Sequence, residues 1–122
     1  MKIIIILLML LTVTNSHADD GKGNFAIWGV GNNSCYSYYS ARENNNYDDY
    51  KNFLMGFLTA YNALAPDTFR ISGNMDIDAI IDWIDAHCET NKLHAFQQGI
   101  SAYIIAHADK RLKKSPRRSQ LK

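Results

Sequence analysis

The chain has 122 residues, 47% of them hydrophobic, with two cysteines and nearly equal numbers of basic and acidic side chains. This length suits one small domain, and two cysteines are too few for a Cys-rich metal site. The charge is unevenly divided. Residues 19–109 carry five Lys and Arg against twelve Asp and Glu, whereas residues 110–122 carry seven basic side chains and no acid. We expect an acidic body and a basic tail.

Residues 1–18 have the three parts of a bacterial signal peptide. Lys2 supplies the positive charge, and residues 3–13 form an almost unbroken apolar run of eleven residues. A bilayer core needs about 20 residues, so this run is too short to span it. Ser16 and Ala18 provide the small residues of a cleavage site. We expect cleavage after Ala18 and export to the periplasm, with an uncleaved anchor as the alternative.

Residues 19–33 contain four glycines and no sustained helical period. We expect an extended arm whose Trp28 docks on the domain. Ser34 then suits the N-cap of a short helix that starts at Cys35 and runs to about Glu43. Three consecutive asparagines follow and end this predicted helix.

The clearest predicted element is a helix over residues 47–64, where apolar side chains recur at spacings of three and four. This stripe consists of Tyr50, Phe53, Leu54, Phe57, Leu58, Tyr61 and Leu64. Two aspartates lie in the first turn, where the helix dipole favours negative charge, and Pro66 ends the element. Gly56 costs helix stability, so we expect another helix to approach closely there.

Two further helices are predicted. Asn74 caps one that runs from Met75 to Cys88, with Cys88 facing the core. Asn91 caps the last one, which ends near Arg111. Its predicted apolar side consists of Leu93, Phe96, Ile100, Tyr103, Ile104 and His107. The pattern therefore predicts an all-α bundle of about four helices over residues 34–111, followed by a disordered basic tail over residues 112–122.

Cys35 and Cys88 are the only cysteines, and the expected export permits oxidation. We predict that they form a disulfide. In the loop-entropy model this bond lowers the entropy of the unfolded chain and so stabilises the fold by roughly 4 kcal/mol. Two buried free thiols are the alternative.

Asp78, Asp82 and Asp85 share one predicted helix face. Asn74, Asp76 and Asp78 also match the start of a calcium-loop count, but an alanine replaces the turn glycine and the isoleucines indicate a continuous helix. We therefore expect a solvated acidic face that could bind a basic protein partner.

The basic tail offers Lys113, Lys114, Arg117 and Arg118 as a second candidate binding surface. Such a segment could touch an anionic membrane surface, or it could simply keep the chain soluble. Export and the lack of interleaved aromatics argue against nucleic acid.

No catalytic or cofactor motif is present. Ser72, Ser101 and Thr59 lack the context of an activated nucleophile. His87 and His94 flank a helix break and could meet, but no third metal ligand is indicated. We expect no metal, no cofactor and no enzymatic activity.

Several segments resemble a group of small bacterial periplasmic proteins. They are Ser34-Cys35, the FLTAYN run of residues 57–62, Gly73-Asn74 with Asp76, the WID run of residues 83–85 and the CETN run of residues 88–91. The helix-Cys to helix-Cys layout is also similar to the HdeA and HdeB acid-stress chaperones and to the Rap/Tai immunity proteins of type VI secretion.

The likeness to HdeA implies a homodimer that loosens in acid and exposes an apolar face to unfolded client proteins. Protonating the twelve carboxylates of the body would leave it strongly positive and less stable, as this role requires. The likeness to the immunity proteins implies that the acidic face of Asp78, Asp82 and Asp85 binds and neutralises a basic effector. An accessory subunit of an envelope complex is the third hypothesis.

Overall fold

The structure is a computed structural model that describes residues 24–116. Four α-helices and no strand occur among these residues, so the predicted all-α bundle is confirmed. The helices are α2 (Cys35–Glu43), α3 (Asp48–Leu64), α4 (Ile77–Thr90) and α5 (Phe96–His107), with the short 3-10 turns η2 (Gly29–Asn32) and η3 (Ala108–Lys110). Within residues 24–116, no helix has the length and hydrophobicity that a transmembrane span requires. The predicted signal peptide lies outside the described residues.

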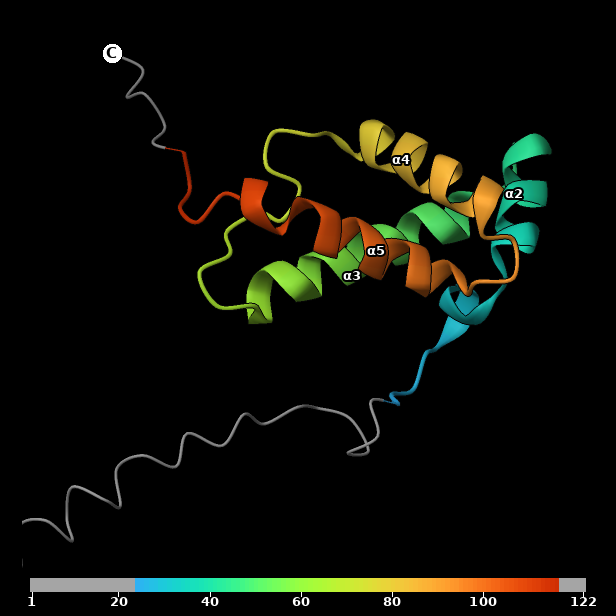
Figure 1. The fold of residues 1–122 in the computed structure, drawn as a ribbon, viewed down its shortest axis with the longest axis horizontal. Coiled ribbons are helices and arrows are strands. Elements are labelled where there is room, and N and C mark those ends of the chain that lie inside the picture. Colours follow the sequence, from blue (N-terminus) through green and yellow to red (C-terminus); the bar gives the residue numbers. More distant parts are fainter. Residues whose placement is uncertain (1–23, 117–122) are drawn as a thin grey trace, which may run out of the picture.

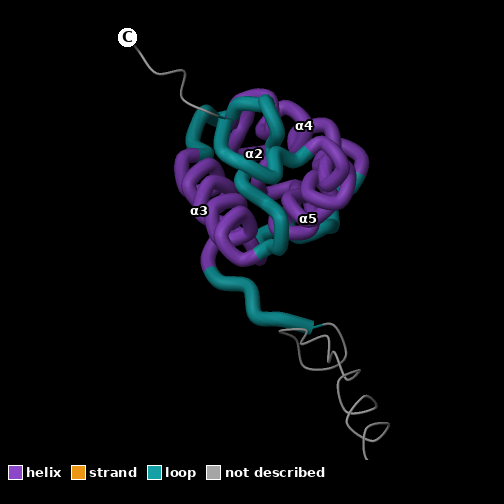
Figure 2. The backbone as a smooth tube through the Cα atoms, turned by 90° about the vertical axis from the view of Figure 1, so that its left-hand side faces the viewer, coloured by secondary structure: helices purple, strands orange, loops and turns teal. Residues whose placement is uncertain are grey.

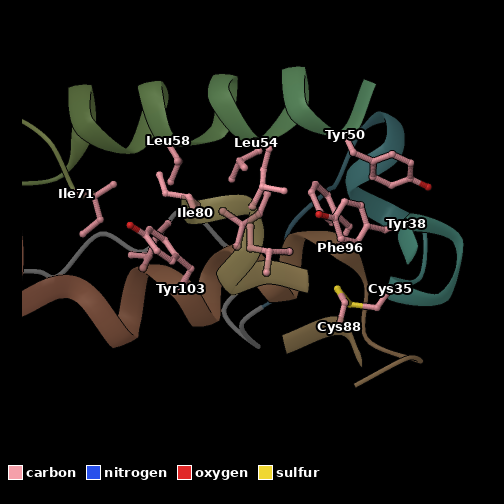
Figure 3. Packing of buried hydrophobic residues seen from close by; sticks show 14 residues of the cluster. Cys35, Tyr38, Tyr50, Leu54, Leu58, Ile71, Ile80, Cys88, Phe96 and Tyr103 are labelled. Carbon is pink, nitrogen blue, oxygen red and sulfur yellow. A yellow bond between two sulfur atoms is a disulfide. The ribbon is translucent and has the colours of Figure 1, made fainter. Parts of the chain in front are cut away.

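α3, α4 and α5 lie lengthwise beside one another, and α2 closes one end of the bundle (Figure 1). Seen end on, α3 lies on one side and α4 and α5 on the other (Figure 2). The core fills the space between them. In Figure 3, Leu54 and Leu58 of α3 point toward Ile80 of α4 and Tyr103 of α5, and all four side chains are buried.

Both ends of α2 agree with the sequence, but α4 and α5 begin later than predicted. Ser34 caps α2, since its hydroxyl accepts from the Ser37 N–H at 3.2 Å. The cap of α4 is Asp76 rather than Asn74, because the Asp76 carboxylate accepts from the Ala79 N–H at 2.9 Å. Asn74 instead belongs to the turn before the helix.

α5 begins after Ala95 rather than at Asn91, because the Gln98 side chain accepts from the Ala95 N–H at 2.8 Å. The residues between α4 and α5 therefore form a short loop. Leu93 lies in it and is 94% exposed, so the prediction that Leu93 faces the core is wrong. The helical period predicts a buried side only for residues within a helix, and Leu93 precedes α5.

The predicted disulfide between Cys35 and Cys88 is confirmed (Figure 3). It joins the first residue of α2 to the last turn of α4, and both cysteines are fully buried. The Cys35 N–H also donates to the His94 carbonyl at 2.7 Å. α2 is thus attached both to α4 and to the loop that precedes α5.

Two predictions about packing near α3 are wrong. Trp28 does not dock on the domain, since it is 83% exposed. The contact is made instead by η2, where Gly31 lies so close to the ring of Phe53 that a Cβ atom would overlap it. Gly56 has no close neighbour, because a Cβ there would meet nothing within 4 Å.

The chain after α5 folds back onto the loop between α3 and α4. Arg70 and Leu112 exchange backbone hydrogen bonds of 2.9 and 3.1 Å. The first residue of the predicted tail is therefore attached to the body, and the exposed basic residues of that tail begin at Lys113.

Candidate functional site

Asp85, one of the three aspartates of the predicted acidic face, forms a cross-link between α4 and α2. Its carboxylate accepts from Arg42 Nη2 at 2.6 Å and from the Tyr38 hydroxyl at 2.6 Å. The hydrogen bond from Arg42 raises the pKa of that guanidinium, while burial and the bond to Asp85 raise the pKa of the Tyr38 hydroxyl. Asp85 therefore fastens two helices, and its charge is largely neutralised.

Asp78 and Asp82 lie at the surface. The Asp78 carboxylate is 3.1 Å from Lys51 Nζ and so connects α4 to α3; this hydrogen bond raises the pKa of Lys51. Asp82 is exposed and takes part in no ion pair within residues 24–116. The predicted face is thus divided, because two of its three members serve as links between helices.

An open cleft of about 540 Å³ lies between α2 and α4. It is lined by Tyr39, Arg42, Glu43, Asp82, Asp85, Ala86 and Glu89. Glu43, Asp82 and Glu89 are exposed. Because Glu43 comes from α2, periodicity along α4 could not reveal that it joins this set. The acidic surface that the structure offers is this acidic cleft rather than a stripe along one helix.

The described part of the basic tail, residues 112–116, lies away from the acidic cleft. Lys113 and Lys114 are exposed, whereas Arg117 and Arg118 lie outside the described residues. The chain leaves the bundle at the end opposite α2 (Figure 1). Lys113 and Lys114 are therefore separate from the acidic cleft in one copy of the protein.

The apolar stripe of α3 is wider than the core can cover. Tyr50, Leu54 and Leu58 are buried, each 7% exposed or less. The outer members of the stripe, together with two side chains of the N-terminal arm, remain partly or largely exposed. This apolar band consists of Phe25, Trp28, Phe53, Phe57, Tyr61 and Leu64. The sequence signal was the number of apolar positions on α3, which exceeds what one buried face requires.

Two shallow grooves run along the apolar band. One, of about 210 Å³, lies between the arm and α3 and is lined by Phe25, Ala26, Ile27, Trp28, Phe53, Phe57 and Gln97. The other, of about 350 Å³, is lined by Phe57, Ala60, Tyr61, Leu64 and Ala65. Phe57 belongs to both, so the grooves adjoin. Trp28 and Leu64, each 83% exposed, extend the apolar surface beyond them. Extended exposed apolar surfaces mark interaction sites.

His87 of α4 and His94 of the following loop meet, as their places on either side of the helix break suggested. His87 Nε2 and His94 Nδ1 lie 3.4 Å apart. The indole of Trp83 stacks on the His87 ring, with ring centres 5.8 Å apart and planes inclined by 13°. Burial, followed by the neighbouring His94, lowers the pKa of His87. Both effects favour the neutral imidazole.

Two of the three hydroxyl groups considered as nucleophiles, those of Thr59 and Ser101, make local contacts. Thr59 donates to the Met55 carbonyl, and Ser101 accepts from the Gln97 amide at 2.6 Å. No group of three or more His, Cys, Asp or Glu side chains in the described part of the chain could hold a metal ion. That the protein is not an enzyme stays a prediction.

No family model, no curated protein and no solved structure matches this chain. The resemblance to small periplasmic proteins, to HdeA and HdeB and to the immunity proteins therefore stays a prediction.

Proposed function

We propose that this chain is an exported, non-catalytic binding protein that acts in the periplasm as an HdeA-like acid-stress chaperone. The observation that carries the proposal is the apolar band on α3. Proteins that unfold in acid expose apolar side chains, and burying such surface gains about 25 cal/mol per Å². Adjoining shallow grooves suit clients of different sequence better than one closed pocket would.

At neutral pH the apolar band is covered by a second copy of the chain. Trp28 and Leu64 would otherwise leave large apolar side chains in water at both ends of the surface. A homodimer built on this band buries them. Dissociation on acidification would then free the same surface for clients.

Acid weakens the links between the helices but not the disulfide. The contacts of Asp85 with Arg42 and of Asp78 with Lys51 both need an ionised carboxylate. Protonating the carboxylates also leaves the body strongly positive, so its own charges repel. A disulfide does not titrate, so α2 and α4 stay joined. In acid the helices would therefore separate in part, while the disulfide keeps α2 and α4 connected.

The test is a client-aggregation assay at about pH 2 to 3, followed by light scattering. The purified protein should reduce the scattering of an acid-denatured client. Leu64→Ser should weaken the protection, whereas Leu93→Ser should not, because Leu93 is also largely exposed but lies in the α4–α5 loop outside the apolar band. No protection by the unaltered protein, or equal loss in both variants, would overturn the proposal.

The acidic cleft favours a second candidate, an immunity protein that neutralises a basic secreted effector. Glu43, Asp82 and Glu89 present three exposed carboxylates to such a partner. The gene should then neighbour an effector gene. Replacing these three residues with their amides should abolish binding of that effector. A third candidate, an accessory subunit of an envelope complex, instead predicts stable co-purification with a membrane assembly.

A further inference from the structure

The His87–His94 pair is open on one side and lies outside the surfaces discussed above. His94 is exposed and His87 is partly exposed. Their facing atoms, Nε2 of His87 and Nδ1 of His94, are 3.4 Å apart. A good N–H hydrogen bond is about 2.7 to 3.2 Å long. The two rings are therefore close, but they are too far apart for a strong hydrogen bond between them.

The separation suits two ligands of one metal ion. Zinc binds imidazole nitrogen at about 2.0 to 2.1 Å in tetrahedral geometry. Two ligand atoms at that bond length, with the tetrahedral angle between them, lie about 3.3 to 3.4 Å apart. The observed distance agrees with this value, and neutral imidazoles are the form that metals bind.

The backbone that carries both ligands is held in place before any metal arrives. The Asn91 side chain donates to the His87 carbonyl at 2.8 Å, and the His94 N–H donates to the Asn91 carbonyl at 3.0 Å. The Cys35 N–H fixes the His94 carbonyl from the other side. Below the His87 ring, Gly99 allows α5 to pass close, since a Cβ there would lie 3.4 Å from His87 Cδ2. Binding therefore requires little movement of the backbone.

We propose that His87 and His94 form a binding site for a divalent transition-metal ion of the zinc or copper class, with His87 Nε2 and His94 Nδ1 as ligands. Water fills the remaining coordination positions on the exposed side. The bound ion would pin the end of α4 to the loop that leads into α5. The site does not depend on the proposed chaperone role.

Trp83 provides the optical probe, because it stacks on His87. The chain has two tryptophans, so Trp28→Phe leaves Trp83 as the only one. In this background, prepared without a histidine tag, CuCl₂ should quench Trp83 fluorescence saturably at one ion per chain. Electron paramagnetic resonance of the copper complex should show coupling to two imidazole nitrogens. ZnCl₂ should compete for the site.

His94→Gln should weaken copper binding by at least about tenfold, since it removes one of two protein ligands. Circular dichroism checks that this exposed substitution leaves the fold intact. His107→Gln is the matched control, because His107 also lies beside Trp83, with ring centres 5.7 Å apart. The control should bind copper as before. Absence of saturable quenching, unchanged affinity in His94→Gln, or loss of binding in His107→Gln alone would overturn the proposal.

Discussion

The α2 end of the bundle and the outer face of α3 are stabilised in different ways. At the α2 end, the Cys35–Cys88 disulfide and the Arg42–Asp85 pair connect segments that are far apart in the sequence. α3 is held mainly by packing of its inner side chains, and its outer side chains form the apolar band. The α2 end is thus held by a disulfide and an ion pair, whereas the outer face of α3 leaves apolar side chains exposed.

The largest effect is expected from removing the disulfide. The bond closes a loop with a sequence separation of 53, so Cys35→Ser should cost roughly 4 kcal/mol of a total of about 5 to 15. Thermal unfolding under oxidising conditions measures the loss. Reducing the unaltered protein should lower its Tm similarly. An unchanged Tm in Cys35→Ser would show that the α2 end does not depend on this bond.

The two faces of α3 should respond differently to the same substitution. Leu54→Ala should cost about 3 kcal/mol, because Leu54 is fully buried and its removal leaves a cavity. Leu64→Ala should change the free energy of unfolding by less than about 0.5 kcal/mol, since its side chain is mostly in water. Urea unfolding measures both. Similar losses would mean that the apolar band belongs to the core.

The cross-link of Asp85 should contribute less than either the disulfide or the core. Asp85→Asn keeps the shape but removes the charge that faces Arg42, and should cost about 1 kcal/mol. Asp82→Asn is the control and should have little effect, because Asp82 is exposed and unpaired within residues 24–116. Equal urea midpoints for the two variants would contradict the division of the acidic face.

The smallest expected effect is a pH dependence from His87. Its pKa in the fold is below the ordinary 6.5, mainly through burial, so the unfolded chain takes up the proton first. Stability should therefore fall as the pH drops through about 6.5, until the folded imidazole also binds its proton. In His87→Gln, the decrease between about pH 7 and 5 should be smaller. The same slope in both proteins would contradict this assignment.

The elements and the disulfide could be predicted because they leave local signals in the sequence. The spacing of Leu54 and Leu58 identifies α3, and Ser34 marks the start of α2. The first residue of α4 is harder to predict, because Asn74 and Asp76 are both good caps. Asp76 is the cap since Asn74 lies in the turn before the helix. Local patterns therefore predict which elements form better than they predict the residue at which each element begins.

The surfaces could be predicted only in part, because they depend on which helices become neighbours. The partner of Asp85 is 43 residues away, and no pattern along α4 points to Arg42. The exposure of Leu64 also follows from packing, since the helical period gives it the same weight as Leu54. Only the meeting of His87 and His94 could be anticipated, because His94 lies in the short loop that directly follows the last turn of α4.

The central claim is that the apolar band binds proteins that unfold in acid. It is tested most directly by placing a photo-activated cross-linking residue at Leu64 or at Leu93 and irradiating each variant with a client at about pH 2 to 3. Both leucines are exposed, but only Leu64 belongs to the band. The account predicts cross-links to the client from position 64 and few from position 93. Equal cross-linking from both positions, or none from position 64, would contradict it.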